Sequence, residues 1–286
     1  FPPPLLVPQT DPFEFVVTGC NDSLQSYVQV NNTTPDTLRV DAWAQDLRHQ
    51  ARLRILALTY GADMNIEFPN TIAAINQHYS NFDLETINTI LAAELETALQ
   101  HQDVLLMPEP ESGSASVFTT LGPVIRAFAN RGGRVIFCGT STSSVWNTGL
   151  FSGNYVGTAS TSTVLTVVAP DHPLMEGMPL TFTGPGTNYV FNLTDPDIVP
   201  LIMAPTGMIS AYRRYGDGMA AFVGFEYTNV NTSAARVIAN LITRPLMELG
   251  SVQPPQLIIA PGASLPFSLD FFAEGLVSGT YAGRIY

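Results

Sequence analysis

Three short, almost wholly apolar runs constrain the fold of this chain more than any other feature. They are residues 53–59, 103–107 and 134–138, and segments with helical periodicity separate them. Apolar runs of this length are typical of strands buried on both faces, as in a parallel sheet. Strand, helix and strand in alternation predict right-handed βαβ units. The middle of the chain is therefore expected to be an α/β domain with helices on both faces of a parallel sheet.

The segments around these runs fit the same scheme. Apolar residues at helical spacing predict helices within 68–79, 87–99 and 117–128. Strand patterns dominate from residue 158 to 225, and the sequence Tyr-Gly-Asp-Gly at 215–218 is typical of a hairpin turn. A closing helix is expected to begin at Thr232-Ser233.

The two ends of the chain carry strand patterns without helices. Residues 1–12 are rich in proline and predict an extended linker. Residues 13–50 and 251–286 are each too short to bury a core. We therefore expect them to form one β-sandwich, with an α/β domain at 51–250 inserted between its strands. The alternative is that the halves belong to different sandwiches or pack on the α/β sheet. Predicted members of the sandwich core are Phe15, Val28, Leu38, Leu269 and Tyr281.

The composition of the chain excludes some partners. The net charge is −12 and all 12 basic residues are arginine, whereas nucleic-acid binding requires clustered Lys and Arg. No apolar run approaches the ~20 residues that span a bilayer, so no transmembrane segment is expected. Low charge, abundant Ser, Thr and Asn, and the absence of Lys favour an extracellular or cell-surface location. The first residues, Phe-Pro-Pro-Pro without a signal peptide, indicate a piece of a longer chain with neighbouring domains.

Five features of the middle segment occur in a suggestive order. They are the strand at 53–60, the strand and proline at 103–108, the helix, Gly-Gly and strand passage at 128–136, the His-Pro-Leu segment at 171–178 and the hairpin at 214–225. Together they resemble the flavodoxin-like domain of class I glutamine amidotransferases and their non-amidotransferase relatives. The resemblance covers residues 53–248 and implies that fold.

Two departures from the family pattern remove its catalytic residues. The family's nucleophilic Cys lies in Gly-x-Cys-x-Gly at a tight turn, and a His and a Glu two residues apart activate it. Here Cys138 has no Gly two positions before it and falls inside the strand. Thr228 and Val230 occupy the positions of the His and the Glu. The resemblance thus implies a domain without amidotransferase or thiol-hydrolase activity, unless a loop brings His172 to Cys138.

The carboxyl ends of the strands are the expected binding region, because open α/β sheets bind ligands there. No pair of histidines has metal-ligand spacing, so neither a metal site nor a cofactor is expected. The predicted lining residues are Tyr60, Glu109, Glu111, Ser112, Thr140 and Trp146.

The chain ends resemble the Ig-like sandwich modules of bacterial surface proteins. The resemblance rests on Val-Gln-Val-Asn at 28–31, on 38–43 and on the Gly-Leu and Gly-Thr-Tyr sequences within 275–281. It implies a non-catalytic structural, adhesion or binding module of a larger exported protein, with a protein or carbohydrate partner. Two alternatives remain: a hydrolase that uses Cys138 or the hydroxyls of 139–144, and a sugar- or peptide-binding domain.

Overall fold

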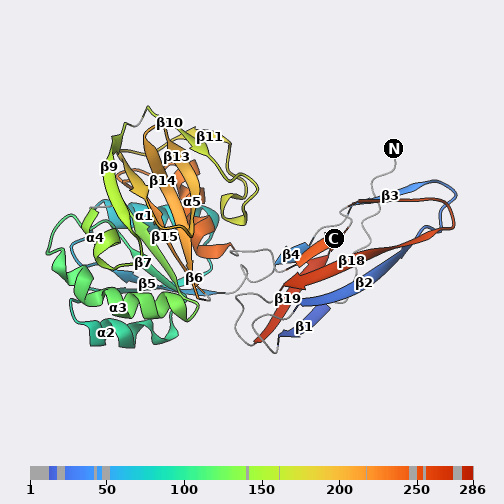
Figure 1. Ribbon diagram of the computed structural model, residues 1–286, viewed down its shortest axis with the longest axis horizontal. Coiled ribbons are helices and arrows are strands. Elements are labelled where there is room, and N and C mark those ends of the chain that lie inside the picture. The colour runs from blue at the N-terminus through green and yellow to red at the C-terminus, as the bar shows by residue number, and fades with distance from the viewer. Residues whose placement is uncertain are drawn as a thin grey trace. The chain divides into compact units, whose positions relative to one another are not determined.

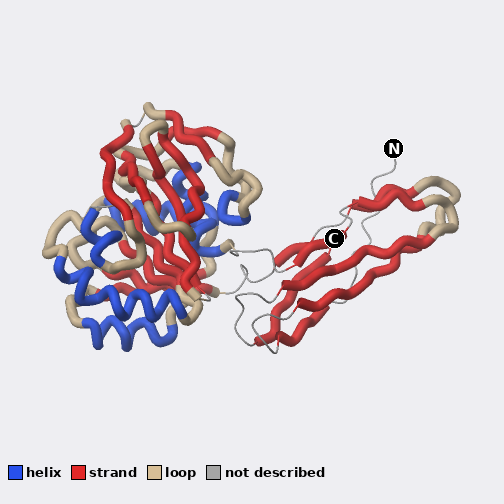
Figure 2. Tube along the Cα trace, viewed as in Figure 1, coloured by secondary structure: helices blue, strands red, loops and turns tan. Residues whose placement is uncertain are grey.

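The chain divides into two compact units in a computed structural model. One unit comprises both chain ends, Phe1–Ala51 and Pro245–Tyr286, and the other is Arg52–Arg244. Figures 1 and 2 show the helices and strands of each unit. The structure describes residues 13–17, 23–41, 44–46, 52–139, 142–160, 162–216, 218–244, 250–253, 256–272 and 279–285.

The unit Arg52–Arg244, called the α/β unit below, is built on one mixed sheet (Figure 1). The strand order in its parallel half is β6 (Phe82–Ile87), β5 (Leu53–Leu58), β7 (Val104–Met107), β8 (Arg134–Cys138) and β15 (Gly218–Val223). Every neighbouring pair in this half is parallel. Counted along the chain the order is 2-1-3-4-5, which is the flavodoxin-like arrangement. The prediction that the three apolar runs form one parallel sheet is confirmed.

The other half of the sheet is antiparallel. β14 (Gly207–Tyr215) pairs with β15, and the register Tyr215↔Gly218 confirms the predicted hairpin. β13 (Ile198–Ala204), β10 (Val164–Val167) and β11 (Thr181–Thr183) extend the sheet beyond β14. β12 (Asn188–Leu193) pairs with both β14 and β9 (Gly153–Ala159).

Helices cover both faces of the parallel strands. α2 (Ala92–Ala98), α3 (Ser116–Asn130) and α4 (Thr142–Asn147) lie on one face, and α1 (Glu67–His78) packs against α5 (Thr232–Thr243) on the other (Figure 1). Alternate strand residues point to opposite faces, so Leu105 and Phe137 join the core beneath α2 and α3 while their neighbours face α1 and α5. This burial on two faces is why the runs are almost wholly apolar.

One helix begins later than its periodicity predicts. The pattern indicates a helix from residue 87, but Ile87 ends β6 and α2 begins at Ala92. The Thr89 hydroxyl accepts a hydrogen bond from Leu91 N (3.1 Å) and donates to a carboxylate oxygen of Glu94. This local turn competes with the helix and delays its start.

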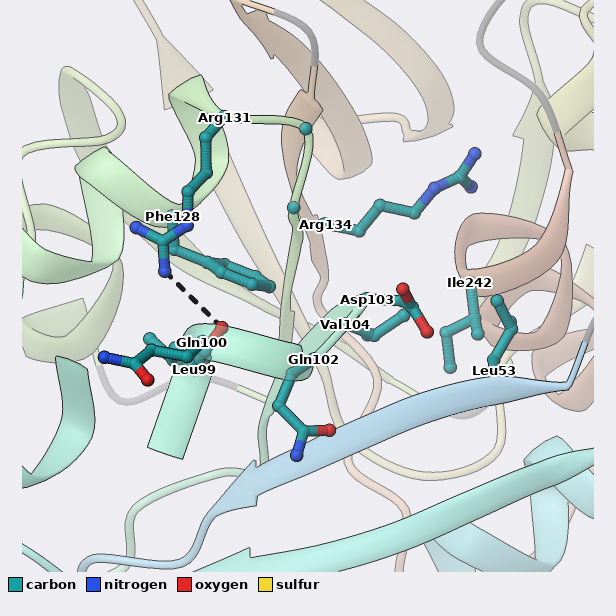
Figure 3. Close-up of a pocket in the computed structure, with 12 residues that line it drawn as sticks. Leu53, Leu99, Gln100, Gln102, Asp103, Val104, Phe128, Arg131, Arg134 and Ile242 are labelled. Carbon is teal, nitrogen blue, oxygen red and sulfur yellow. Dashed lines mark hydrogen bonds between the residues drawn. The ribbon is translucent and has the colours of Figure 1, made fainter. Parts of the chain in front are cut away.

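The α/β unit begins and ends at neighbouring points. Leu53, the first residue of β5, and Ile242, near the end of α5, line the same cavity of about 290 Å³ at the amino ends of β5, β7 and β8 (Figure 3). Arg134 Nη1, from the start of β8, donates to Leu241 O of α5 at 2.9 Å beside this cavity. Neighbouring ends allow a domain to be inserted between two strands of another.

In the other unit the two chain ends pair strand by strand, always antiparallel. Phe15 lies opposite Tyr281, Val28 opposite Phe267 and Leu38 opposite Ile259. The pairs are β1 (Phe13–Val17) with β19 (Gly279–Ile285), β19 with β4 (Ala44–Asp46), β2 (Ser23–Asn31) with β18 (Ser264–Phe272), β18 with β16 (Gly250–Gln253), and β3 (Leu38–Asp41) with β17 (Gln256–Ile259).

A buried polar residue fixes one end of this paired region. Asn32 is only 2% exposed, and its Nδ2 donates to Ile259 O and to Asp36 O, both at 2.8 Å. The Ig-like sandwich stays a prediction, as do the domain boundaries of 13–50, 51–250 and 251–286. The side chains of Phe15, Val28, Leu269 and Tyr281, and the linker 1–12, lie outside the described residues.

Among the residues that the structure describes, no helix has the length and apolar character needed to cross a bilayer.

Candidate functional site

Three glutamates meet at the carboxyl edge of the parallel strands. Glu67 begins α1 after β5, Glu109 follows β7 and Glu226 follows β15. One carboxylate oxygen from each lies within 4.8 Å of the other two. β5 and β7 flank the point where the strand order reverses, which is where flavodoxin-like sheets bind ligands. These residues are called the glutamate cluster below.

A local turn and the first turn of α1 fix the position of Glu67. The side chain of Asp63 accepts hydrogen bonds from Asn65 N (2.8 Å) and Ile66 N (3.2 Å), and this turn sets the first residue of α1. Inside the helix, Thr71 Oγ1 donates to Glu67 O at 2.8 Å. The Glu67 side chain points inward and the residue is 8% exposed.

Glu109 packs against the end of β8. Gly139 has a φ of +62°, and a Cβ added there would overlap Glu109 Oε2. Glycine is therefore required both by the backbone conformation and by the approach of the carboxylate. Glu109 is 5% exposed, and Tyr189 of β12 donates a hydrogen bond to its carboxylate.

Glu226 is oriented by the loop that precedes β12. Thr187 N donates to Glu226 Oε2 at 3.3 Å, and Glu226 N donates to Thr187 O at 3.2 Å. Asn188 and Phe225 form an isolated antiparallel bridge beside this pair of bonds. The half-buried Glu226 side chain is thus held toward the other two glutamates.

The glutamate cluster is strongly repulsive when it is fully ionised. Burial, together with the charges of Glu67, Glu111 and Glu226, raises the pKa of Glu109 to about 8 against the opposing effect of the Tyr189 hydrogen bond. Burial also raises the pKa of Glu67 to about 7, with the charges of Glu111, Glu226 and Asp63 adding to the effect. Near neutral pH the cluster therefore holds protons unless a cation replaces them.

Two oxygens of the cluster have no hydrogen-bond partner among the described residues. They are Glu67 Oε2 and Glu109 Oε2, and both are buried. None of the ion pairs within the described part of the chain includes Glu67, Glu109 or Glu226. A buried carboxylate without a partner is costly, so this arrangement suits a bound cation or a shared proton.

The structure brings several of the predicted binding residues to the same edge. The backbone N–H groups of Glu111 and Ser112 donate to Gly61 O at 2.8 and 3.2 Å, which holds the loop after β7 against the loop after β5. The Tyr60 hydroxyl accepts a hydrogen bond from Ser114 N at 2.9 Å. Glu109 belongs to the glutamate cluster itself, whereas the Glu111 and Ser112 side chains are exposed. Thr140 lies outside the described residues.

Trp146 belongs to a group of rings next to the cluster. Its ring lies 5.7 Å from that of buried Phe191, and the Tyr155 ring lies 6.0 Å from Phe191 and 6.1 Å from Tyr189. Trp146 and Tyr189 are half-buried and Tyr155 is 37% exposed. We call Trp146, Tyr155 and Tyr189 the aromatic strip. The Tyr189 hydrogen bond to Glu109 connects the strip to the glutamate cluster.

Cys138 and His172 are not brought together. Cys138 is 2% exposed, and burial raises the pKa of its thiol far above the usual range, with the charge of Glu109 adding to the effect. His172 Nε2 is hydrogen-bonded to the Tyr212 hydroxyl at 2.9 Å, and its Nδ1 accepts from Leu174 N at 3.2 Å. Both ring nitrogens of His172 are thus occupied in fixing a turn, and burial lowers the pKa of the ring.

The sequence did not single out Glu67 or Glu226 as site residues. Glu67 stands at the start of a helical pattern, where an acidic residue is common because it favours the positive end of the helix dipole. Glu226 lies three residues after Val223, the last residue of β15. A search for acidic residues shortly after each buried strand would have found Glu226 together with Glu109.

Comparisons with known proteins identify a class of similar folds. No known protein family matches the sequence, and no curated protein does. A Salmonella typhimurium cytoplasmic protein is 9% identical, with a TM-score of 0.49, over 68% of this chain and 100% of its own. A ThuA-like protein of Bacteroides uniformis is 11% identical (TM-score 0.49; 66% and 88% covered). A protein of Thermoplasma acidophilum described as part of a GMP synthase is 10% identical (TM-score 0.48; 67% and 93% covered). The amidotransferase-like fold expected from the sequence is thus represented among these structures, at low identity.

The expected extracellular or cell-surface location is corrected by the same comparison. Two of the similar structures, both from Salmonella typhimurium, are named cytoplasmic proteins. Low charge and abundant Ser, Thr and Asn were the sequence basis of that expectation, and such composition is compatible with more than one compartment.

Proposed function

We propose that the α/β unit is a non-catalytic binding module whose ligand lies at the carboxyl edge of the parallel strands, beside the glutamate cluster. The proposal rests on the burial of Cys138 and on the raised pKa of its thiol. A thiol acts as a nucleophile when it is deprotonated and accessible. Cys138 is buried within β8, and its environment raises its pKa instead of lowering it.

The surroundings of Cys138 support the same reading. A base within hydrogen-bond reach could activate the thiol. His172 is engaged with Tyr212 and Leu174 instead. Thr228 is exposed, Val230 is half-buried, and neither side chain is a base. Acyl transfer through a cysteine is therefore not the chemistry that this geometry favours.

Alkylation by iodoacetamide tests the proposal. In a Cys20→Ser variant Cys138 is the single thiol, because the chain has two cysteines. The matched control carries Cys20→Ser, Cys138→Ala and Thr120→Cys, which places a thiol at an exposed position of α3. Near pH 7.5 we expect Cys138 to react at least about 100-fold more slowly than the control thiol, and equally fast after denaturation.

Glutamine hydrolysis provides the second readout. Ammonia release by the wild-type chain is expected to equal that of Cys138→Ala. Rapid alkylation of Cys138 in the folded protein, together with hydrolysis that Cys138→Ala abolishes, would refute the non-catalytic reading.

The aromatic strip favours carbohydrate as the ligand class. Sugars present apolar faces to aromatic rings, and ligand sites combine such rings with a few polar groups. Binding to an array of oligosaccharides tests this candidate. Tyr155→Ala is expected to weaken any binding at least about tenfold, whereas Leu180→Ala, a change at a residue that is 65% exposed on another segment, should leave it unchanged. Equal binding by both variants would exclude the aromatic strip as the sugar site.

A further inference from the structure

The spacing of the glutamate cluster is compatible with a bound cation. Ca²⁺ binds oxygens at about 2.3–2.6 Å, so two ligands on opposite sides of one ion lie about 5 Å apart. Mg²⁺ binds at about 2.0–2.1 Å and limits this separation to about 4.2 Å. The three carboxylate oxygens lie within 4.8 Å of one another. Separations within this limit leave room for one Ca²⁺ ion between the three carboxylates.

The unpaired buried oxygens are a second observation that points to a ligand. Glu67 and Glu109 are 8% and 5% exposed, and Oε2 of each has no hydrogen-bond partner among the described residues. The hydrogen bond from Tyr189 to Glu109 and the hydrogen bond from Thr187 N to Glu226 come from neutral groups, so they do not neutralise these carboxylates. A cation between the carboxylates would offset the charge of these buried groups.

We infer that Glu67, Glu109 and Glu226 form a Ca²⁺ site at the strand-order reversal of the α/β unit. Three carboxylates supply three to six of the six to eight oxygens that Ca²⁺ takes, and water or carbonyl oxygens supply the others. The inference deepens the proposed function, because it rests on the same edge being the binding site. It also assigns a role to Glu67 and Glu226, which were not among the binding residues expected from the sequence.

Protons compete with the cation for this site. The groups that face the cluster are Asp63 before α1, Glu111 after β7, Tyr189 of β12 and Cys138 of β8. All are acidic or neutral, so they favour either a proton or a cation on the glutamates. Because carboxylates bind a metal ion in their deprotonated form, the affinity for Ca²⁺ should fall as the pH is lowered.

Calorimetric titration of the full chain with CaCl₂ tests the inference after EDTA treatment and buffer exchange. Near pH 8 we expect saturable binding of one Ca²⁺ per chain. Glu109→Gln and Glu226→Gln should each raise the Kd at least about tenfold, because each removes a charged ligand. Glu96→Gln, which changes an exposed glutamate of α2, is the matched control and should bind as the wild type does. MgCl₂ should bind more weakly than CaCl₂.

Thermal unfolding separates loss of binding from loss of folding. In EDTA the Glu→Gln variants should melt no lower than the wild type, because each relieves repulsion within the cluster. With CaCl₂ the wild type and Glu96→Gln should gain several degrees, whereas Glu109→Gln and Glu226→Gln should gain clearly less at the same CaCl₂ concentration. Glu226 is half-buried, so its replacement tests the site even if the Glu109 variant fails to fold.

Two results would overturn the inference. One is the absence of saturable heat up to about 10 mM CaCl₂, beyond the weakest natural Ca²⁺ affinities. The other is binding that Glu96→Gln weakens as much as the cluster variants do. Neither result bears on the alkylation of Cys138, so the failure of the Ca²⁺ site can be distinguished from a failure of the non-catalytic proposal.

Discussion

Replacing Glu109 by Gln is expected to stabilise the α/β unit at alkaline pH when no cation is present. Folding raises the pKa of Glu109 from 4.5 to about 8, so the folded state binds the proton more tightly than the unfolded state. Stability is therefore lost as the pH rises from about 4.5 to 8, and the loss is complete above that range. A tenfold difference in proton affinity corresponds to about 1.36 kcal/mol. Ionisation of Glu109 in the folded state therefore lowers the free energy of unfolding by at most about 5 kcal/mol.

The variant removes this cost because glutamine cannot ionise. Near pH 9 we expect Glu109→Gln to be more stable than the wild type by about 3 kcal/mol. This is less than the upper limit, because the wild-type site relaxes around the ionised carboxylate. Near pH 5.5 the wild-type carboxyl is protonated and similar in shape to the amide. Both can accept the Tyr189 hydrogen bond, so the difference should fall below about 1 kcal/mol.

Urea unfolding in EDTA at both pH values measures the effect. A Trp43→Phe background leaves Trp146, which lies in the α/β unit, as the single tryptophan reporter. Glu96→Gln is the control and should show no pH-dependent difference from the wild type. A stability difference for Glu109→Gln that is the same at pH 5.5 and pH 9 would refute the assigned electrostatics, whatever its sign.

Three further substitutions test the packing that positions the site. Gly139→Ala should lower stability by about 2–4 kcal/mol in urea unfolding, because its φ is +62° and its Cβ would overlap Glu109; an unchanged midpoint would contradict this. Asn231→Ala should cost about 1 kcal/mol by the same assay, since the Asn231 side chain accepts from Ser233 N (3.0 Å) and Ala234 N (3.1 Å) at the start of α5; Thr232→Ala should cost less. Phe137→Ala should cost about 3–5 kcal/mol in thermal or urea unfolding, because the ring is 1% exposed in the core beneath α3.

The parallel half of the sheet could be predicted from the sequence because burial on two faces leaves a simple signal. Residues 53–58, 104–107 and 134–138 are apolar on both faces, and no other common element produces such short runs. β9 and β12 could not be found in this way. β9 carries Gly153 and Gly157 and is largely exposed, so its apolar and polar residues do not alternate clearly. Pairing with β12, and not its own pattern, makes it a strand.

Of the three residues of the glutamate cluster, only Glu109 could be predicted from the sequence. Glu109 was expected because it comes directly after a buried strand, and the carboxyl ends of parallel strands share one edge. Glu67 and Glu226 join it only after β5, β7 and β15 are placed in one sheet and the β12 loop is folded over them. Their proximity is a tertiary property, and the raised pKa values follow from that proximity and from burial.

The neighbouring ends of the α/β unit have a consequence for the order of folding. Asn32 and Ile259 must meet although they are 227 residues apart, and closing so long a loop of unfolded chain carries a large entropic cost. Once the α/β unit has folded, Leu53 and Ile242 border one cavity, and the effective loop shrinks to a few dozen residues. This shortening lowers the closure cost by about 1–2 kcal/mol. The pairing of β2 with β18 is therefore expected to follow the formation of the α/β unit.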